Sequence, residues 1–371
     1  MPSGLHDHLS EKLAAQLRKR ITRDGPIPFS EFMAAALYEP DLGYYQRSDL
    51  VRWGRAGDYR TAPESSALFG ATWARYFAGC YRQIGAPPSW TIVEAGAGAG
   101  DFAATCLAAL RSDHPEVFQA TTYLVDEISD ASVLRSKERL RSFGDTVTFG
   151  RIHDLPADSL TGIVFANELL DAFPVTRVTE QGGIPGELCV ALDQLDEFFW
   201  RFKPGIKPEI GAYLETLDIE LAEGQIADVC LGAAEWWARA ATVLKRGYLI
   251  AVDYGAEAAD LYSAELRPHG SLRAFADHQL HQDALYLPGR LDLTANVDWT
   301  TILNTGDGQG LETVYFGSLN KFLLDAGVFE VLEGSIHQAD QVTKVRLGHS
   351  AREFILPGGL AESFQVLIQG R

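Results

Sequence analysis

The chain has 371 residues, 46% hydrophobic and 22% charged, which suits a soluble globular protein of two or three compact units, or of one large elaborated α/β domain. Its 50 acidic residues outnumber 32 basic ones, and the net charge of −18 argues against nucleic acid and for a basic protein partner. No apolar run is long enough to span a bilayer or to act as a signal segment, so we expect no membrane association and a cytoplasmic location.

Cysteine and histidine spacing gives no sign of a metal centre. The cysteines are too far apart in sequence for a ligand pair, so we expect buried thiols at Cys80, Cys106, Cys189 and Cys230. The histidines at 269, 278 and 281 fit no compact ligand spacing, and we interpret them as polar loop residues. We therefore expect no metal. The sequence leaves the oligomeric state open, a homodimer included.

The first 88 residues are predicted to form a helical region. Leucine or isoleucine recurs every four residues from Leu5 to Ile21, which is typical of a helix packed along one face. Ser30 is the expected N-cap of a second helix that reaches Tyr38. A third helix is expected over about 65–85, before the boundary at Pro87 and Pro88.

From Trp90 the pattern changes to strands that alternate with helices, which predicts a parallel, doubly wound sheet whose first half covers 89–181. The expected strands are 91–93, 123–125, 147–149 and 162–166, and the expected helices are 101–110 and 130–141. Residues 182–246 are expected to form an antiparallel insertion followed by a helix over about 223–244. A core strand lies in 247–255, and 256–312 is expected to be a lid or substrate-docking segment. The last segment, 313–371, is expected to add a helix over 316–326 and strands near 329–332 and 364–368.

The strongest local signal is a glycine turn after the first strand of this sheet. Glycines at Gly96, Gly98 and Gly100 would let a ligand approach the backbone and the N-terminus of the next helix. The spacing is not that of a dinucleotide fingerprint, since Asp101 follows directly. Glu94 would oppose a pyrophosphate but suits a ligand with an ammonium group and a sulfonium cation. The alternative is a glycine-rich turn with solvated acids and no ligand.

Further polar residues follow the later strands. Glu127 stands where a carboxylate usually binds a ribose diol, and with the glycine turn it favours S-adenosyl-L-methionine over NAD or FAD. We also assign to cofactor binding Ile128, Asp154, Leu155 and Asn167.

The stretch Asn167-Glu168-Leu169-Leu170-Asp171 comes directly after the fourth strand, where ligands of open α/β sheets bind. Asn167 could accept a hydrogen bond from an N–H group, and Glu168 and Asp171 would share a face if this stretch were helical. Carboxylates that clamp a guanidinium are what arginine methylation requires, so we predict these three residues to be catalytic. The alternative is a helix N-terminus with acids placed against its dipole.

Several motifs in order resemble the MidA family of methyltransferases, from about Ile27 to Leu367. The matching pieces are Phe29 to Met33 with Leu42 to Tyr45; Gly57 to Glu64; Glu94 to Gly100; Ala166 to Val175; Val252 to Gly255; Gly270 to Arg273; and Asp292 to Asp298. The resemblance implies a class I methyltransferase with a Rossmann-like, doubly wound α/β sheet, an N-terminal helical region and an inserted antiparallel or lid segment. Mitochondrial members of the family help to assemble respiratory complex I by symmetrically dimethylating an arginine on one of its subunits.

The resemblance also implies site residues. A segment closing over the cofactor from the N-terminal region would contain Gly57, Asp58, Thr61, Pro63 and Glu64. We assign to substrate binding Tyr45, Asp253, Tyr254 and Arg273. The chain departs from the family pattern at Asn296, Leu360 and Gln365, which concerns the substrate more than methyl transfer.

The sequence thus predicts an S-adenosyl-L-methionine-dependent methyltransferase acting on an exposed arginine of a protein. Two alternatives remain open at this point: a non-catalytic assembly chaperone or binding protein on the same fold, and a methyltransferase with a small-molecule substrate.

Overall fold

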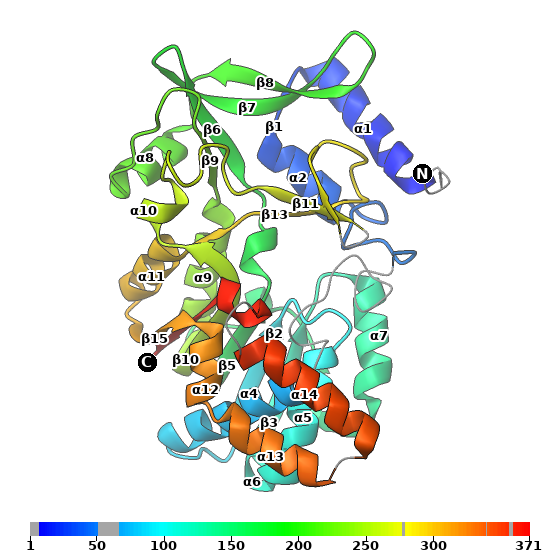
Figure 1. The fold of residues 1–371 in the computed structure, drawn as a ribbon, viewed down its shortest axis with the longest axis vertical. Helices are drawn as coiled ribbons and strands as arrows, with labels where there is room; N and C mark the ends of the chain where they lie inside the picture. The colour runs from blue at the N-terminus through cyan, green and yellow to red at the C-terminus, as the bar shows by residue number, and fades with distance from the viewer. Residues whose placement is uncertain (1–6, 51–66, 277–278, 339, 356–358) are drawn as a thin grey trace. The chain divides into compact units, whose positions relative to one another are not determined.

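A computed structural model describes residues 7–50, 67–276, 279–338, 340–355 and 359–371. The chain forms two compact units, each built from three stretches of sequence. The core unit contains Arg60–Leu170, Glu235–Tyr254 and Ile302–Arg371. The accessory unit contains Met1–Tyr59, Asp171–Ala234 and Gly255–Thr301. Figure 1 labels most elements of both.

The core unit is built on one twisted mixed sheet with the strand order β15-β16-β10-β5-β2-β3-β4. The strands are β2 (Trp90–Ala95), β3 (Thr121–Asp126), β4 (Val147–Phe149), β5 (Leu160–Asn167), β10 (Leu244–Ala256), β15 (Glu312–Ser318) and β16 (Phe364–Gly370). From β4 to β10 all neighbours are parallel, whereas β16 is antiparallel to both β10 and β15. The chain leaves β2 toward β3 on one side and returns to β5 on the other. The carboxyl ends of β2 and β5 therefore flank the point where ligands bind in doubly wound sheets.

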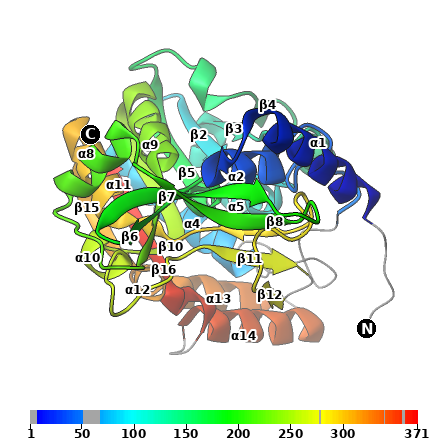
Figure 2. The same ribbon diagram turned by 90° about the horizontal axis from the view of Figure 1, so that it is seen from above.

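Helices cover this sheet and provide its apolar core. They are α4 (Ala67–Gln83), α5 (Asp101–Asp113), α6 (Pro115–Ala120), α7 (Asp130–Leu140), α9 (Leu231–Val243), α11 (Trp299–Gly308), α12 (Leu319–Asp325), α13 (Val328–Gln338) and α14 (Gln341–Ile355). Helices α13 and α14 lie side by side in both views (Figures 1 and 2). Trp73 of α4 is fully buried against Phe165 of β5 and Phe322 of α12. Burial of such rings anchors the helices on the sheet.

The accessory unit has an antiparallel sheet of order β1-β7-β6-β9, with β8 paired to β7, and a three-stranded sheet of order β12-β11-β13. The strands are β1 (Ile27–Pro28), β6 (Thr176–Gln181), β7 (Ile184–Leu192), β8 (Phe198–Pro204), β9 (Ile226–Val229), β11 (Arg273–Ala276), β12 (Gln279–His281), β13 (Asp292–Thr294) and β14 (Val297–Asp298). Its helices are α1 (His8–Asp24), α2 (Phe29–Tyr38), α8 (Pro208–Thr216) and α10 (Ala258–Leu261). The leucine stripe of α1 is buried at Leu13, Leu17 and Ile21, as its period predicts.

A buried ion pair fixes the loop that precedes β11. Asp228 accepts hydrogen bonds from Arg177 Nε (2.8 Å) and from the backbone N–H groups of Ser271 (2.6 Å) and Leu272 (2.8 Å). The Arg177 guanidinium lies 4.7 Å from the ring centroid of Trp200. Gly270 has φ +79°, and a Cβ there would lie 2.3 Å from Asp228 Oδ2, so this turn requires glycine.

Most predicted elements are confirmed, including the parallel strands, the insertion and the last strand, and four are corrected. Helix α2 begins at Phe29 with Pro28 as its N-cap, so Ser30 is not the cap. Residues 226–229 form strand β9, because they pair with β6, and the predicted helix begins only at Leu231. Residues 312–318 are strand β15, and the helix expected over 316–326 is confined to 319–325.

The fourth correction concerns the stretch near Phe329, which is helix α13 and not a strand. Its apolar residues Val331 and Leu332 pack against the core cluster. A short apolar run cannot by itself distinguish a buried helix from a strand. Helix α14 is an element that the sequence pattern does not predict.

The expected segment boundaries also differ from the two units. Residues 1–88 divide between the two units, and the second stretch of the accessory unit begins at Asp171. In the described ranges, no helix is both long and apolar enough to cross a membrane. Of the four cysteines, which all lie in these ranges, none forms a disulfide, and Cys80, Cys106 and Cys189 are buried.

Candidate active site

The glycine turn after β2 has a backbone that only glycine adopts readily. Gly96, Gly98 and Gly100 have φ of +69°, +54° and +78°. Gly100 is the N-cap of α5, so the turn leads directly into a helix N-terminus. A Cβ on Gly96 would lie 3.0 Å from Leu169 Cδ1, in the segment after β5. The turn therefore brings the ends of β2 and β5 close together, within the core unit.

Glu127, at the end of β3, is bound to this turn. Its carboxylate accepts hydrogen bonds from the backbone N–H groups of Gly98 (2.7 Å) and Ser129 (2.7 Å). The next residue, Ile128, leaves 47% of its surface exposed, which is unusual for a large apolar side chain at the end of a buried strand. A carboxylate beside an exposed apolar surface is suited to a ribose and the base attached to it.

Glu94, by contrast, lies beneath the turn and is only 5% exposed. Its Oε2 accepts a hydrogen bond from the hydroxyl of Tyr123, at 2.7 Å. Burial raises the pKa of Glu94 to about 8, although the hydrogen bond from Tyr123 lowers it. A nearby cation would favour the ionised form.

Asp126 was missed by sequence reasoning. This buried carboxylate ends β3, accepts a hydrogen bond from the backbone N–H of Ile152 (3.0 Å) and forms an ion pair with Arg151 (2.6 Å). It thereby holds the 3₁₀ turn Ile152–Asp154 at the end of β4, where the predicted cofactor residues Asp154 and Leu155 lie. The signal that could have found it is the succession of two acids, Asp126 and Glu127, at one strand end.

At the end of β5, Asn167 and Glu168 present a carboxylate next to an amide. Asn167 Nδ2 donates to Glu168 Oε1 (3.1 Å), and the hydroxyl of Tyr254 donates to Glu168 Oε2 (3.3 Å). Asn167 Oδ1 is buried and has no hydrogen-bond partner among the described residues. A buried acceptor left without a donor costs about 1–3 kcal/mol, so it marks a place for a ligand N–H.

Glu168 has a φ of +50°, a conformation that is strained for a residue with a side chain. Glu168 is therefore not part of a helix and shares no helical face with Asp171. The chain turns sharply after β5 and forms only the single 3₁₀ turn Leu170–Ala172. Because Glu168 precedes this 3₁₀ turn, the direction of its side chain is not set by a helix that also contains Asp171.

Asp253 supports the same turn from β10. Its Oδ2 accepts hydrogen bonds from the backbone N–H groups of Leu169 (3.2 Å) and Leu170 (2.9 Å), and its Oδ1 from that of Tyr254 (2.9 Å). Asp253 is 1% exposed. These contacts make it a positioning residue for Glu168, whereas Tyr254 contacts the Glu168 carboxylate itself.

The core unit thus contains the glycine turn and the predicted residues Glu94, Glu127, Ile128, Asp154, Leu155, Asn167, Glu168, Asp253 and Tyr254. Three predicted residues belong to the accessory unit. There Asp171 is buried, the hydroxyl of Tyr45 donates to Asp292 Oδ1 (2.7 Å), and Arg273 is exposed at the start of β11. Gly57, Asp58, Thr61, Pro63 and Glu64 lie outside the described residues.

A sheet of this order is parallel except for β16, which lies antiparallel between β10 and the edge strand β15. Together with a GxGxG turn and acids at the ends of β2 and β3, it defines a class I methyltransferase that uses S-adenosyl-L-methionine. The model of a family described as "Putative S-adenosyl-L-methionine-dependent methyltransferase" matches residues 72–317, more than half of the chain. The chain therefore belongs to this family, the MidA family that its motifs resemble.

Curated relatives and solved structures agree with this. "Protein arginine methyltransferase NDUFAF7, mitochondrial" of Danio rerio is 26% identical, over 96% of this chain and 86% of the relative. The homologue of Drosophila melanogaster is 27% identical, over 80% and 70%. A Burkholderia thailandensis protein solved with S-adenosyl-homocysteine has a TM-score of 0.86 and 29% identity, over 100% of this chain and 95% of that one.

These names correct the expected cytoplasmic location, because the curated relatives are named as mitochondrial. Composition and the lack of an apolar segment carry no information that separates these compartments.

Proposed function

We propose that this methyltransferase methylates the guanidinium group of an arginine in a protein substrate. The observation that carries the proposal is the buried Asn167 Oδ1, without a donor among the described residues, beside the strained carboxylate-bearing residue Glu168. A guanidinium has five N–H donors in a plane and no acceptor, so it can satisfy both oxygens of a carboxylate and an adjacent amide oxygen at once. The relatives named as protein arginine methyltransferases support the same substrate class.

In this proposal, the residues of the core unit have separate roles in binding the cofactor and the guanidinium. The glycine turn, Glu127 and Ile128 would hold the cofactor, and Asp154 and Leu155 would border it. The bound cofactor supplies an electrophilic methyl group on a sulfonium. Glu168 would orient the guanidinium and keep its positive charge on the nitrogens that do not react, while Tyr254 and Asn167 hold the carboxylate in place through the hydrogen bonds at 3.3 and 3.1 Å.

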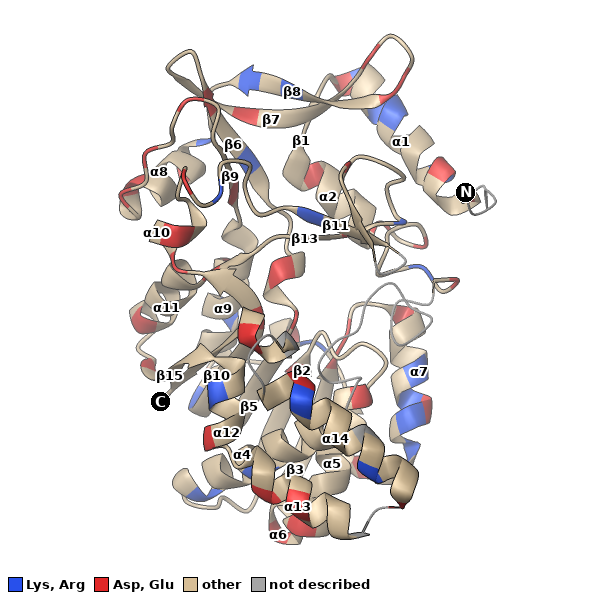
Figure 3. Ribbon diagram, in the orientation of Figure 1, with Lys and Arg blue, Asp and Glu red and all other residues tan. Residues whose placement is uncertain are grey.

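The charge of the chain suits a basic protein segment. Acidic residues lie along both units, and a run of basic ones stands out on α7 (Figure 3). With a net charge of −18, long-range attraction would favour encounter with arginine-bearing segments.

The test is methylation of hypomethylated protein extract with S-adenosyl-L-methionine labelled at its methyl group, followed by amino-acid analysis for methylarginine. We expect the wild type to label arginine and Glu168→Gln to lose about 100-fold or more in rate, because the neutral amide cannot balance the guanidinium charge. Tyr254→Phe, which keeps the carboxylate, should lose far less.

Cofactor affinity, measured by calorimetry, serves as the control and should be unchanged in Glu168→Gln. Wild-type labelling of arginine by this variant would refute the assignment of Glu168. Label on another residue or on small molecules alone would refute the arginine substrate.

A further inference from the structure

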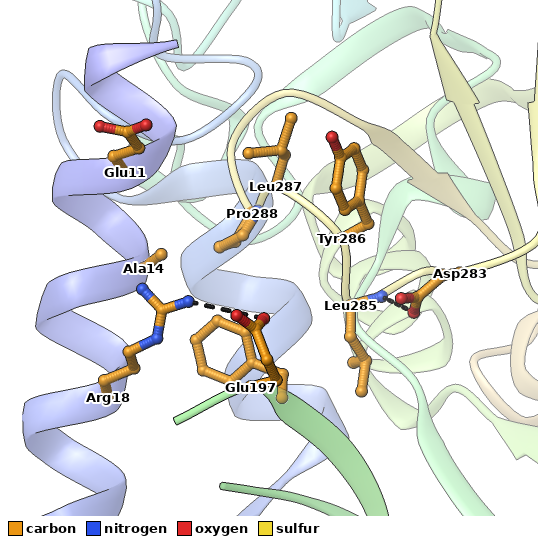
Figure 4. Close-up of a pocket in the computed structure, with 10 residues that line it drawn as sticks. Glu11, Ala14, Arg18, Glu197, Asp283, Leu285, Tyr286, Leu287 and Pro288 are labelled. Atoms are coloured by element: carbon orange, nitrogen blue, oxygen red, sulfur yellow. Dashed lines mark hydrogen bonds and ion pairs between the residues drawn. The ribbon is translucent and has the colours of Figure 1, made fainter. Parts of the chain in front are cut away.

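The accessory unit contains a pocket that is separate from the residues discussed above. It has a volume of about 430 Å³ and lies among α1, the start of β8 and the loop 283–288. Figure 4 shows Glu11 and Arg18 projecting from α1, with Tyr286 and Asp283 on the facing loop. A pocket of this volume can take one or two long side chains of a peptide.

The base of the pocket is apolar. Ala14 and Leu285 are 5% and 3% exposed and form its buried part, with Leu287 and Pro288 beside them. Leu287 has a φ of +46°, and its carbonyl accepts a hydrogen bond from the backbone N–H of Arg290 at 3.0 Å. The loop therefore has an unusual backbone conformation at Leu287, and the neighbouring Tyr286 is 55% exposed.

The rim carries three carboxylates and one guanidinium, which gives the pocket a formal charge of −2 (three negative, one positive) from Glu11, Glu197, Asp283 and Arg18. The single base is already engaged. Arg18 Nε donates to the carbonyl of Asp196 (2.7 Å), and its guanidinium lies 5.1 Å from the ring centroid of Phe198 and 3.9 Å from Glu197. An anionic ligand would therefore meet mainly repulsion here.

A lysine or arginine side chain fits this lining, because it has an apolar stem for the base of the pocket and a cation for its acidic rim. Its aliphatic stem would lie on Leu287 and Pro288, and its cation would lie near the Tyr286 ring and the carboxylates of Glu197 and Asp283. We propose that this pocket binds a lysine or arginine side chain of the protein substrate at a position other than the methylated arginine. The inference rests on the proposed function in one respect, namely that the substrate is a protein.

The binding test uses a fluorescein-labelled hexalysine peptide, which contains no arginine, and measures its anisotropy with the full chain at low salt. The double variant Glu197→Gln/Asp283→Asn removes two charges. The side-chain amide oxygen that it introduces at position 283 can still accept the hydrogen bond that Leu285 N–H donates at 2.9 Å. The matched control is Glu209→Gln/Glu215→Gln on the exposed face of α8, which removes the same charge from the same unit.

We expect the pocket variant to weaken hexalysine binding about tenfold and the control less than twofold. Tyr286→Ala should weaken it about threefold, and Tyr286→Phe should not, because the ring and not the hydroxyl contacts the cation. Equal losses in the pocket and control variants would mean that only overall charge attracts the peptide, and this would overturn the proposal. No loss in the pocket variant would overturn it as well.

A second measurement separates this proposal from that of arginine methylation. With a basic peptide that carries one arginine among several lysines as substrate, the pocket variant should raise KM about tenfold and leave kcat unchanged. If the wild type does not methylate the arginine but binds hexalysine through the pocket, the proposed function fails and the basic-segment site stands. If methylation proceeds with unchanged KM in the pocket variant, the pocket proposal fails alone.

Discussion

Glu94 and Asp228 are both nearly fully buried, one in each unit, but their surroundings differ. Asp228 accepts hydrogen bonds from a guanidinium and two backbone N–H groups, so its charge is balanced within the accessory unit. Glu94 accepts one from the neutral hydroxyl of Tyr123, and burial raises its pKa to about 8. A balanced buried carboxylate stabilises a loop, whereas an unbalanced one costs stability unless a cation binds beside it. The comparison separates a structural acid from an acid suited to a cationic cofactor.

The largest expected effect comes from breaking the balanced acid. Asp228→Ala leaves Arg177 buried without its carboxylate and frees two N–H groups, so the free energy of unfolding should fall by about 3–5 kcal/mol. Denaturant unfolding measures this, with Glu209→Ala on the exposed face of α8 as a control that should change little. A loss below about 1 kcal/mol would contradict the view that Asp228 fixes the loop before β11.

Glu94, the buried carboxylate without a balancing charge, should instead make the free energy of unfolding depend on pH. Because the folded pKa of Glu94 is raised above the ordinary value of 4.5, the folded state retains a proton that the unfolded chain has lost. Stability should therefore fall as pH rises from about 4.5 and stop falling above about 8, with a loss of roughly 2 kcal/mol between pH 6 and pH 8. Glu94→Gln should remove this loss. Denaturant unfolding at a series of pH values measures it, and the same pH dependence in variant and wild type would disprove the raised pKa of Glu94.

Glu94→Gln should also change the affinity for the cofactor. A cation next to Glu94 should hold the carboxylate ionised, so Glu94→Gln should weaken S-adenosyl-L-methionine more than S-adenosyl-homocysteine, which lacks the sulfonium charge. Calorimetry with both ligands at pH 8 measures the ratio. An equal loss for both ligands would mean that Glu94 does not act on the sulfonium.

The smallest effect is expected at Glu127, whose carboxylate accepts hydrogen bonds from the backbone N–H groups of Gly98 and Ser129. Glu127→Ala should weaken both ligands by about 1.5 kcal/mol, or roughly tenfold, because the ribose that it would bind is common to them. Its hydrogen bond to Gly98 N–H is lost as well, so the melting temperature of the ligand-free protein is the control. Unchanged affinity would remove Glu127 from the cofactor site.

Local patterns of sequence were sufficient to predict the parallel strands of the core sheet and the glycine turn after β2. The apolar runs that became β2, β3, β5 and β10 are buried on both faces, and such strands are recognisable without their partners. The glycine spacing predicted the turn correctly. Positions 96, 98 and 100 all have positive φ angles, which glycine adopts far more readily than other residues. Glu127, Asn167 and Glu168 could be selected because each lies at the end of a strand of a parallel sheet.

Other features of the fold depend on contacts between residues that are far apart in the sequence. Residues 226–229 are a strand because β6 offers backbone partners, and residues near 329 are helical because one face packs on the core. Asp228 acquires its role from Arg177 and a loop more than forty residues away, a pairing that no local pattern encodes. The class of cofactor could be predicted from sequence, because the glycine turn and the acids that indicate it follow the strands β2 and β3 directly. The burial of Glu94, the Asn167 acceptor that has no donor among the described residues, and the pocket beside α1 all depend on segments that are distant in sequence, so only the folded chain defines them.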